Sequence, residues 1–408
     1  MTKRHAIVAG LDIGTSKVAA VIGEMTDQGV EIIGLGTHPS LGLRKGVVIN
    51  IETTVASIKK AVAEAELMAG CEIHSVFTSV GGSHIRGFNS HGIVAVKNKE
   101  VGARDIDRVL DAAKAVAIPT EQEVIHVLPQ DFILDEQDGI KEPLGMSGVR
   151  LEARVHILTG SSMAAQNVIK CCNRAGLNVA GLALMPLTTA EAVLSEKERE
   201  LGVAVVDMGA GTTDIAVYHD GSLRHTAVLP IGGNHVTNDI ATGLRTPFAD
   251  AERIKQRYGL AKTSMVAASE RIEVPSAAGR AAGTVSRQIL CEIIEPRLDE
   301  VFRLVREEFG KSGYAALLAA GAVMTGGSML LPGAVDLAER VLEMPARLGV
   351  PTHIRGLVDV ISSPVYATGV GLVLNGMARQ DRGPFGIRDH SLLAKFRHRM
   401  AYWLDEFF

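Results

Sequence analysis

The chain contains 408 residues, of which 47% are hydrophobic but only 4% aromatic, and its formal net charge is −4. This length exceeds what a single ordinary core supports, so we expect several domains. The charge offers no basic footprint for nucleic acid, and the four cysteines fit neither a disulfide framework nor a zinc motif, which suits a reducing cytoplasm. We expect no signal peptide and no transmembrane helix, because Asp12 interrupts the N-terminal apolar run and no other run reaches ~18–20 residues.

The first half of the chain predicts alternating strands and helices with an insertion. In chain order we expect a hairpin over 6–23 that turns at Gly14 and Thr15, a strand over 30–36, a helix over 53–69 and a buried strand over 76–80. A changed pattern between about 83 and 156 predicts a small α+β insertion with strands over 92–96 and 122–134, a charged helix over 103–115 and a loop over 135–147. The alternation resumes with a strand over 155–159, a helix over 162–175, a strand over 178–184 and a helix from Thr188.

The second half predicts another hairpin and several long helices. Its expected elements are a hairpin over 203–218, a long helical stretch after Gly232 and Gly233, polar strands and loops over 261–283, a helix over 285–309, a buried helix turning into a strand over 314–324, a helix through 332–342 and a closing helix over 364–371. A Gly/Pro-rich segment then predicts a flexible linker before an amphipathic C-terminal stretch.

Two turns far apart in the chain repeat one design, in which an apolar run leads through Asp12 or Asp207 into a Gly/Thr turn and a second apolar run. Such a turn gathers backbone N–H groups and hydroxyls around an anion, and its aspartate can hold a metal ion against that anion. Facing each other across a cleft, the two turns would form a phosphate clamp. For the first turn alone an ordinary hairpin remains an alternative. The second is more specific, because two glycines and two hydroxyls lie between Asp207 and Asp214.

A third element is the segment 323–328, a strand that ends in the diglycine Gly326-Gly327 and opens a helix. This geometry allows a flat ring or a ribose to approach the backbone. Many strand-to-helix turns share it, so it carries weight only together with the other two. Neither the Walker-type phosphate loop nor the dinucleotide-binding fingerprint fits the paired turns.

In this order the three elements resemble the two phosphate turns and the adenosine turn of the actin/Hsp70/sugar-kinase superfamily. Further motifs narrow the resemblance to the FtsA family of bacterial cell-division proteins, nearly from end to end. These motifs are 207–218, Leu223-Arg224-His225-Thr226, the helix with Glu295-Pro296-Arg297, the insertion at 84–156 and the terminal amphipathic segment. The resemblance implies an α/β, actin-like, two-lobed ATPase fold with four subdomains, one of them an inserted α+β subdomain of the 1C type, plus a C-terminal amphipathic helix.

The resemblance also implies how the chain is divided. Subdomain 1A comprises 1–83 and 157–200 with a closing helix at 362–377, subdomain 1C comprises 84–156, subdomain 2A comprises 201–230 and 313–361, and subdomain 2B comprises 231–312. A flexible linker over 378–390 then precedes a membrane-targeting amphipathic helix over 391–408.

ATP and Mg²⁺ in the central cleft are implied by the same resemblance. The residues that would surround the phosphates are Gly14, Thr15, Ser16, Lys17, Gly209, Gly211, Thr212 and Thr213. Asp12 and Asp207 would hold Mg²⁺ through water, and Gly326, Gly327 and Ser328 would border the adenosine. Glu252 and Lys255 match a helix that contacts base and ribose in Hsp70 proteins, although an exposed charge pair is an alternative.

One departure concerns hydrolysis. Hsp70-like ATPases have a Glu-Pro pair before the second phosphate turn, and the glutamate positions the attacking water. The corresponding pair here is Met185-Pro186. A thioether accepts hydrogen bonds too weakly to orient or deprotonate water. We therefore expect at most a weak ATPase and assign no catalytic residue.

The C-terminal stretch has apolar residues at helical spacing on one face, namely Leu392, Leu393, Phe396, Met400, Trp403, Leu404 and Phe407. Lys395, Arg397 and Arg399 lie at its sides. A helix packed on the protein's own core is the alternative, but the preceding linker, the clustered aromatics and the basic flank favour an interfacial membrane helix. Such a helix binds reversibly by itself and more firmly in a row on a polymer.

As partners, the resemblance implies the C-terminal peptide of the division GTPase FtsZ, docked on 231–312, a further copy of the chain in a filament, and later division proteins on 84–156. Arg297 on the helix over 286–309 is the candidate contact for an acidic peptide, with a solvated, charge-balanced helix face as the alternative. The implied function is an ATP-binding scaffold on the cytoplasmic face of the bacterial inner membrane, at the division site, that tethers the FtsZ ring. A small-molecule kinase of the same superfamily and a pilus-assembly relative are the alternatives.

Overall fold

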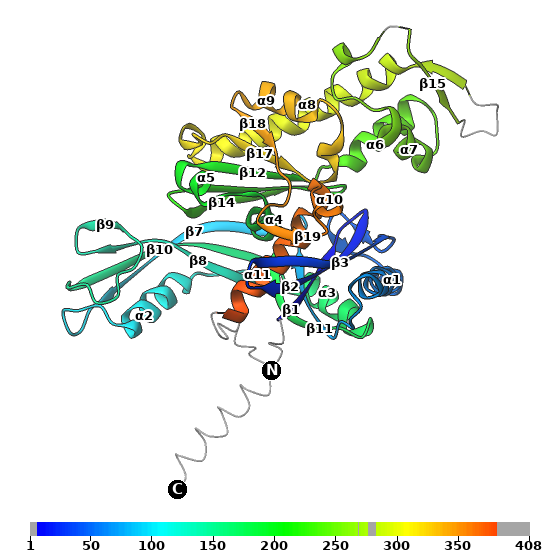
Figure 1. The fold of residues 1–408 in the computed structure, drawn as a ribbon. Coiled ribbons are helices and arrows are strands. Elements are labelled where there is room, and N and C mark those ends of the chain that lie inside the picture. Colours follow the sequence, from blue (N-terminus) through cyan, green and yellow to red (C-terminus); the bar gives the residue numbers. More distant parts are fainter. Residues whose placement is uncertain (1–5, 268, 276–282, 382–408) are drawn as a thin grey trace.

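The structure, a computed structural model, describes residues 6–267, 269–275 and 283–381. These residues form two α/β lobes and an inserted unit that projects to one side (Figure 1). Both lobes are built on the same plan, since each sheet contains an antiparallel hairpin with parallel strands added beside it. The repeat of the two turns in the sequence therefore corresponds to a repeat in the fold.

The first lobe contains a six-stranded sheet. Its strands are β1 (Ile7–Ile13), β2 (Lys17–Thr26), β3 (Gly29–Pro39), β6 (Ser75–Val80), β11 (Asn178–Leu184) and β19 (Ile354–Gly356), in the order β11-β6-β1-β2-β3-β19. The predicted hairpin is β1–β2, and β6 and β11 extend the sheet in parallel. β1 and β2 are buried along most of their length, which explains their nearly continuous apolar sequence.

Helices cover both faces of this sheet. They are α1 (Ile51–Ala69), α3 (Ser162–Arg174), α4 (Met185–Val193), the short α10 (Val358–Ile361) and α11 (Ala367–Asp381). The small hairpin of β4 (Leu43–Arg44) and β5 (Val47–Val48) lies between β3 and α1 in the chain, and η4 (Pro364–Tyr366) leads into α11. The side chain of Asn50 accepts the Thr53 N–H at the start of α1, which ends at Gly70 with φ 68°. A Cβ on Gly10 would lie 2.6 Å from the Gly369 carbonyl oxygen, so α11 packs directly on β1.

The second lobe contains a five-stranded sheet. Its strands are β12 (Val203–Met208), β13 (Thr213–His219), β14 (Ser222–Leu229), β17 (Ala322–Thr325) and β18 (Ala346–Leu348), in the order β14-β13-β12-β17-β18. Its other elements are α5 (Glu196–Leu201), α6 (Gly233–Gly243), α7 (Phe248–Tyr258), η1 (Thr263–Met265), β15 (Arg271–Val274), β16 (Gly283–Ser286), α8 (Arg287–Ser312), η2 (Ala315–Leu317), η3 (Gly327–Leu330) and α9 (Ala334–Leu342). Figure 1 shows α8 and α9 over the sheet, with α6, α7 and β15 at its far end.

The inserted unit has a core of its own. Its sheet has the order β7-β10-β8-β9, from β7 (Arg86–Ala95), β8 (Gln122–Leu134), β9 (Gln137–Ile140) and β10 (Arg150–Ser161), and α2 (Ala103–Lys114) packs on one face. Strand β7 begins well before the predicted start at 92. The strand β9 occupies part of the predicted loop over 135–147, because the turn at Asp135 returns the chain onto β8.

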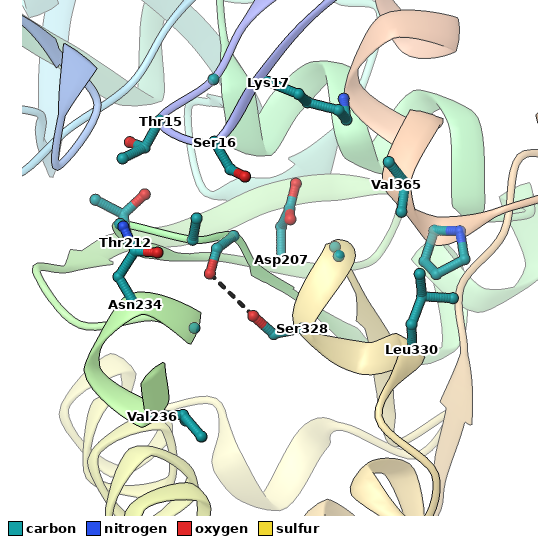
Figure 2. A pocket seen from close by; sticks show the side chains of 18 of the residues that line it. Thr15, Ser16, Lys17, Asp207, Thr212, Asn234, Val236, Ser328, Leu330 and Val365 are labelled. Atoms are coloured by element: carbon teal, nitrogen blue, oxygen red, sulfur yellow. Dashed lines mark hydrogen bonds between the residues drawn. The ribbon is translucent and has the colours of Figure 1, made fainter. Parts of the chain in front are cut away.

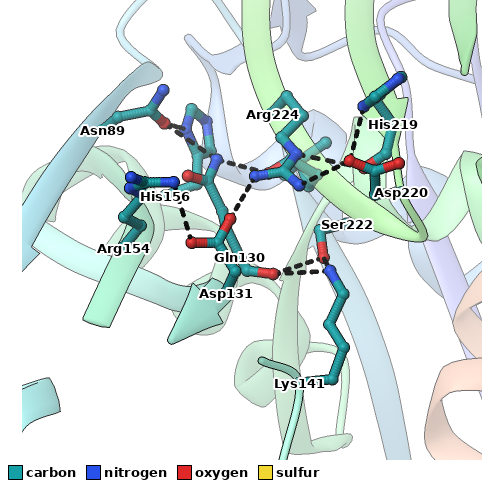
Figure 3. Close-up of polar contacts among 11 residues, drawn as sticks. Asn89, Gln130, Asp131, Lys141, Arg154, His156, His219, Asp220, Ser222 and Arg224 are labelled. Atoms are coloured by element: carbon teal, nitrogen blue, oxygen red, sulfur yellow. Dashed lines mark hydrogen bonds and ion pairs between the residues drawn. The ribbon is translucent and has the colours of Figure 1, made fainter. Parts of the chain in front are cut away.

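A buried polar joint connects the inserted unit to β14 of the second lobe (Figure 3). Arg224 donates to Asp131 at 2.9 Å, and Gln130 donates to the Leu223 carbonyl at 2.8 Å. His156 lies between Asn89 Oδ1, at 2.6 Å from its Nδ1, and Thr226 Oγ1, at 2.9 Å from its Nε2. The insertion is thus part of the first lobe by chain connection and bonded to the second lobe by side chains.

Several other elements differ from the predictions. The helix α4 already begins at Met185 instead of Thr188, since Pro186 suits the first turn of a helix. The helical stretch after Gly232 is divided into α6 and α7, and the helix expected before β17 is reduced to η2. The closing helix α11 runs to Asp381, past its predicted ends at 371 and 377. The predicted terminal helix over 391–408 lies outside the described residues.

Candidate functional site

A cavity of about 470 Å³ lies between the two lobes, and nearly all the residues predicted to bind nucleotide or metal line it (Figure 2). These residues are Asp12, Gly14, Thr15, Ser16, Lys17, Asp207, Gly209, Gly211, Thr212, Glu252, Lys255, Gly326, Gly327 and Ser328. Thr213 does not line it, because its side chain is buried and its hydroxyl donates to the Ile231 carbonyl at 2.8 Å. Three segments distant in sequence therefore meet at one cavity.

The two turns have the same backbone geometry. In the first, the Gly14 N–H donates to the Lys17 carbonyl at 2.9 Å, and in the second the Gly209 N–H donates to the Thr212 carbonyl at 3.0 Å. The turns also touch across the cavity, since a Cβ on Gly211 would lie 2.7 Å from Thr15 Oγ1. Only glycine allows this approach, so the sequence at 211 determines how closely the lobes come together.

Three carboxylates gather at the base of the cavity. Asp207 Oδ2 accepts hydrogen bonds from Thr189 at 2.9 Å and from Thr368 at 3.3 Å, while Asp12 Oδ2 lies 3.2 Å from Lys17 Nζ. Burial raises the pKa of Asp207 to about 6, and burial together with the nearby Asp207 raises the pKa of Asp214 to about 7. The charged carboxylates therefore oppose one another in a poorly solvated space.

A hard cation fits this arrangement. Asp12 Oδ1 and Asp214 Oδ1 are both buried without a hydrogen-bond partner in the described part of the chain. Over the same residues, no group of three or more His, Cys, Asp or Glu side chains is arranged to hold a metal ion. The donor set therefore matches an ion bound by few carboxylates and largely through water, as Mg²⁺ prefers.

The opposite end of the cavity is partly apolar. Ser328 donates to the Gly209 carbonyl at 3.1 Å and so holds the diglycine turn against the second phosphate turn (Figure 2). Leu330, Val365 and Val236 line the cavity with aliphatic side chains at separate places (Figure 2). Exposed backbone of the diglycine turn together with aliphatic side chains is a lining that suits a flat aromatic ring.

Glu252 and Lys255 are a half-buried pair of the cavity wall. Lys255 Nζ lies 2.8 Å from Glu252 and also donates to the Gly233 carbonyl at 3.1 Å, which ties α7 to the start of α6. Their side chains are 29% and 15% exposed, so the alternative of an exposed surface pair is wrong.

Met185 lies at the start of α4 and lines the cavity. A Cβ on Gly81 would lie 2.3 Å from its sulfur, so the side chain is packed against the end of β6.

Two further predictions concern other surfaces. Arg297 is 27% exposed and forms ion pairs with Asp239 at 2.5 Å and with Glu300. The membrane residues between 392 and 407 lie outside the described residues.

Sequence reasoning missed several lining residues. Asp214 follows the second turn directly, and its carboxylate could have been included on position alone. Asn234 follows the diglycine at 232–233, a pattern like that of the adenosine turn. Thr368 of the lining, and Thr189 behind it, carry no local signal, because only the packing of α4 against α11 brings them to Asp207.

The comparison with solved structures supports an actin-like class of fold. The PilM–PilN type IV pilus biogenesis complex matches with a TM-score of 0.66 at 18% identity, covering 90% of this chain and 98% of that chain. MreB5 of Spiroplasma citri bound to ADP matches with a TM-score of 0.58 at 14% identity, covering 93% and 99%. With the inserted unit, these neighbours confirm the predicted actin-like fold.

Sequence relatives identify the family. Cell division protein FtsA of Pseudomonas aeruginosa is 55% identical over 92% of this chain and 91% of its own length, and that of Escherichia coli strain K12 is 43% identical over 98% of both. The family model described as cell division protein FtsA matches 204–371, and the SHS2 domain inserted in FtsA matches 82–159. The chain belongs to the FtsA family of cell division proteins, as its resemblance predicted.

Among the residues that the structure describes, no helix combines the length and the apolar character needed to cross a membrane.

Proposed function

We propose that this chain binds Mg²⁺–ATP between its lobes and acts as a division scaffold on the cytoplasmic face of the inner membrane. The observation that carries the proposal is the pair of matching turns at one cavity, with the unpartnered oxygens of Asp12 and Asp214 beside them. A cation between these oxygens would lie close to a phosphate bound by the two turns. The fold neighbour MreB5, solved with ADP, supports a nucleotide as that ligand.

Each group of cavity residues has a role in this proposal. The backbone of 14–17 and 209–212 and the hydroxyls of the two turns would bind phosphate oxygens. Asp12 and Asp207 would hold Mg²⁺ through water, with Asp214 beside them, and the cation would neutralise phosphate charge. The turn at 326–328 and the aliphatic wall would take the adenosine, while Glu252 and Lys255 would meet its outer edge.

Hydrolysis is expected to be weak. Because Met185 occupies the position of the water-orienting glutamate in Hsp70-like ATPases, no carboxylate at this position can act as a general base. Nucleotide would then act mainly by joining the two lobes, since its phosphates contact a turn from each.

The remaining functions rest on the family and on the C-terminal sequence. We assign membrane attachment to the amphipathic segment at 391–408, FtsZ binding to 231–312 with Arg297 as the candidate contact, and self-assembly and binding of later division proteins to 84–156. Membership of the FtsA family supports this division role over a kinase or a pilus-assembly role.

The direct test of the cleft is calorimetric titration of ATP into the full chain with and without Mg²⁺. We expect Mg²⁺-dependent binding that Asp12→Asn weakens about tenfold or more. Asp107→Asn, which makes the same chemical change on exposed α2 of the inserted unit, serves as the control and should bind like the native chain. Equal binding with and without Mg²⁺, or equal loss in both variants, would refute the assignment.

A further inference from the structure

A second cavity, also about 470 Å³, adjoins the cleft beside the β4–β5 hairpin. It shares Thr15, Ser16, Gly211, Asn234 and Glu252 with the cleft, and its other walls come from the loop after β3, the hairpin and the helices α6 and α7. The residues that give it chemical character are Ser40, Arg44, Lys45, His235 and Asn238. The site described above uses none of these five.

The cavity is electropositive. Within the described residues, the side chains of Arg44 and Lys45 have no hydrogen-bond or ion-pair partner, and both residues are exposed. Glu252 is the acidic residue in the lining, and its charge is already opposed by Lys255 at 2.8 Å. Two cationic groups therefore remain uncompensated at this cavity.

Neutral groups add hydrogen-bond donors. His235 Nδ1 accepts the Gly232 N–H at 3.1 Å, so a neutral His235 carries its proton on Nε2 and can donate it. The hydroxyl of Ser40 is buried and has no partner in the described structure. A buried hydroxyl in this condition is a site of unmet hydrogen bonding, which a ligand with acceptor oxygens would satisfy.

The cationic hairpin is held in place by the two turns. The Gly46 N–H donates to Thr15 Oγ1 at 2.9 Å, and a Cβ on Gly211 would lie 2.9 Å from Lys45 Cα. Lys45 has a positive φ of 51°, which is unfavourable for a residue with a Cβ. A backbone held in this conformation presents its charged residues at a defined place instead of on a loose loop.

We infer that the second cavity binds a small phosphate-bearing anion next to the nucleotide cleft. Unpaired Arg and Lys, a histidine N–H and a free hydroxyl form a donor-rich set that suits a compact, multiply charged oxyanion. The five distinctive residues lie outside the cleft, so binding of a free anion does not depend on the proposed nucleotide site, whereas binding of a distal phosphate rests on it. The anion could arrive free in solution or as the distal phosphate of a nucleotide.

The test is calorimetric titration of inorganic phosphate into the full chain, with the cleft saturated by Mg²⁺–ADP. Saturable binding is expected, and the double variant Arg44→Gln/Lys45→Gln should weaken it about tenfold or more. The control Lys59→Gln/Lys60→Gln removes the same charge from exposed positions of α1 and should leave binding unchanged. Thermal unfolding of both double variants checks that they remain folded.

The titration is repeated with a non-hydrolysable ATP analogue to separate the two sources. If inorganic phosphate binds in the presence of either nucleotide, the cavity is a site for a free anion. If it binds in the presence of ADP but not of the ATP analogue, the third phosphate of the analogue occupies the cavity. The inference would be overturned if inorganic phosphate showed no saturable binding or if ADP competed with it for the same site. Equal weakening of phosphate binding in the two double variants would also overturn it. If the chain binds no nucleotide, phosphate binding by the two double variants is compared in the absence of nucleotide, and this comparison still tests the inference.

Discussion

Gly211 shows how a single residue determines the spacing of the lobes. A Cβ at this position would come within 2.7 Å of Thr15 and 2.9 Å of Lys45, so the contact between the turns leaves no room for a side chain. The neighbouring Gly209 differs, because a Cβ there would meet its nearest atom at an ordinary 3.5 Å. The two glycines of one motif therefore face different constraints.

The change Gly211→Ala should force the turns apart and weaken Mg²⁺–ATP binding about tenfold, since overpacking of this kind costs about 1–3 kcal/mol. Fluorescent-nucleotide titration measures the effect. Gly283→Ala is the control, because a Cβ at 283 would meet nothing within 4 Å. Native affinity in Gly211→Ala would show that the turns do not act together.

The change Met185→Glu tests the proposed cause of weak hydrolysis. A carboxylate at this position could orient water, and we expect ATP turnover to rise about 10²-fold over the native chain, measured as phosphate release. Met185→Leu keeps an apolar side chain and should remain at the native rate. Turnover by the native chain at rates typical of kinases would contradict the interpretation of Met185.

His156 in the joint of the inserted unit should have a measurable pH signature. Burial, with a smaller effect of His225, lowers its pKa from 6.5 to about 4, so the folded protein keeps it neutral where an unfolded chain would protonate it. The unfolded state then binds more protons between these two values, and folding stability should fall by about 3 kcal/mol as the pH decreases through that interval. An NMR titration of the imidazole should show a midpoint near 4, and a midpoint near 6.5 would exclude a buried neutral histidine.

At the scale of elements, the joint between β8 and β14 depends on one ion pair removed from water. The side chains of Arg224 and Asp131 are only 9% and 6% exposed. Because Arg224→Ala leaves Asp131 buried with the half-exposed Arg154 as its remaining ion-pair partner, we expect a loss of about 3–5 kcal/mol in urea unfolding.

The comparison for this loss is Arg303→Ala on α8, which removes an exposed pair with Asp299. Such surface pairs contribute little or nothing to stability. Similar small losses in both variants would mean that the joint does not hold the inserted unit to the second lobe.

The sequence predicted elements well where a local pattern determines them. The hairpins β1–β2 and β12–β13 follow from apolar runs on either side of a Gly/Thr turn, and α1 follows from its helical spacing, although it begins at Ile51 instead of Thr53. The polar β9 was missed, because its residues resemble a loop and only pairing with β8 makes them a strand. The same distinction applies to the site, where the turns have a local signature but Thr189 and Thr368 reach Asp207 only through tertiary packing.

At the scale of the whole molecule, the inserted unit links the two lobes around the cleft. It leaves and re-enters the first lobe next to β6 and α3, and its joint bonds it to β14 of the second (Figures 1 and 3). A rotation of one lobe against the other must therefore shear the joint or move the inserted unit.

The most direct test of the proposed scaffold is co-sedimentation with anionic lipid vesicles, comparing the full chain with a chain truncated after Arg388 in the presence and absence of Mg²⁺–ATP. The full chain should sediment with the vesicles, and more so with nucleotide, because a polymer displays many terminal segments at once. The truncated chain should still bind ATP but stay in the supernatant. Equal sedimentation of both chains would contradict the membrane-scaffold account.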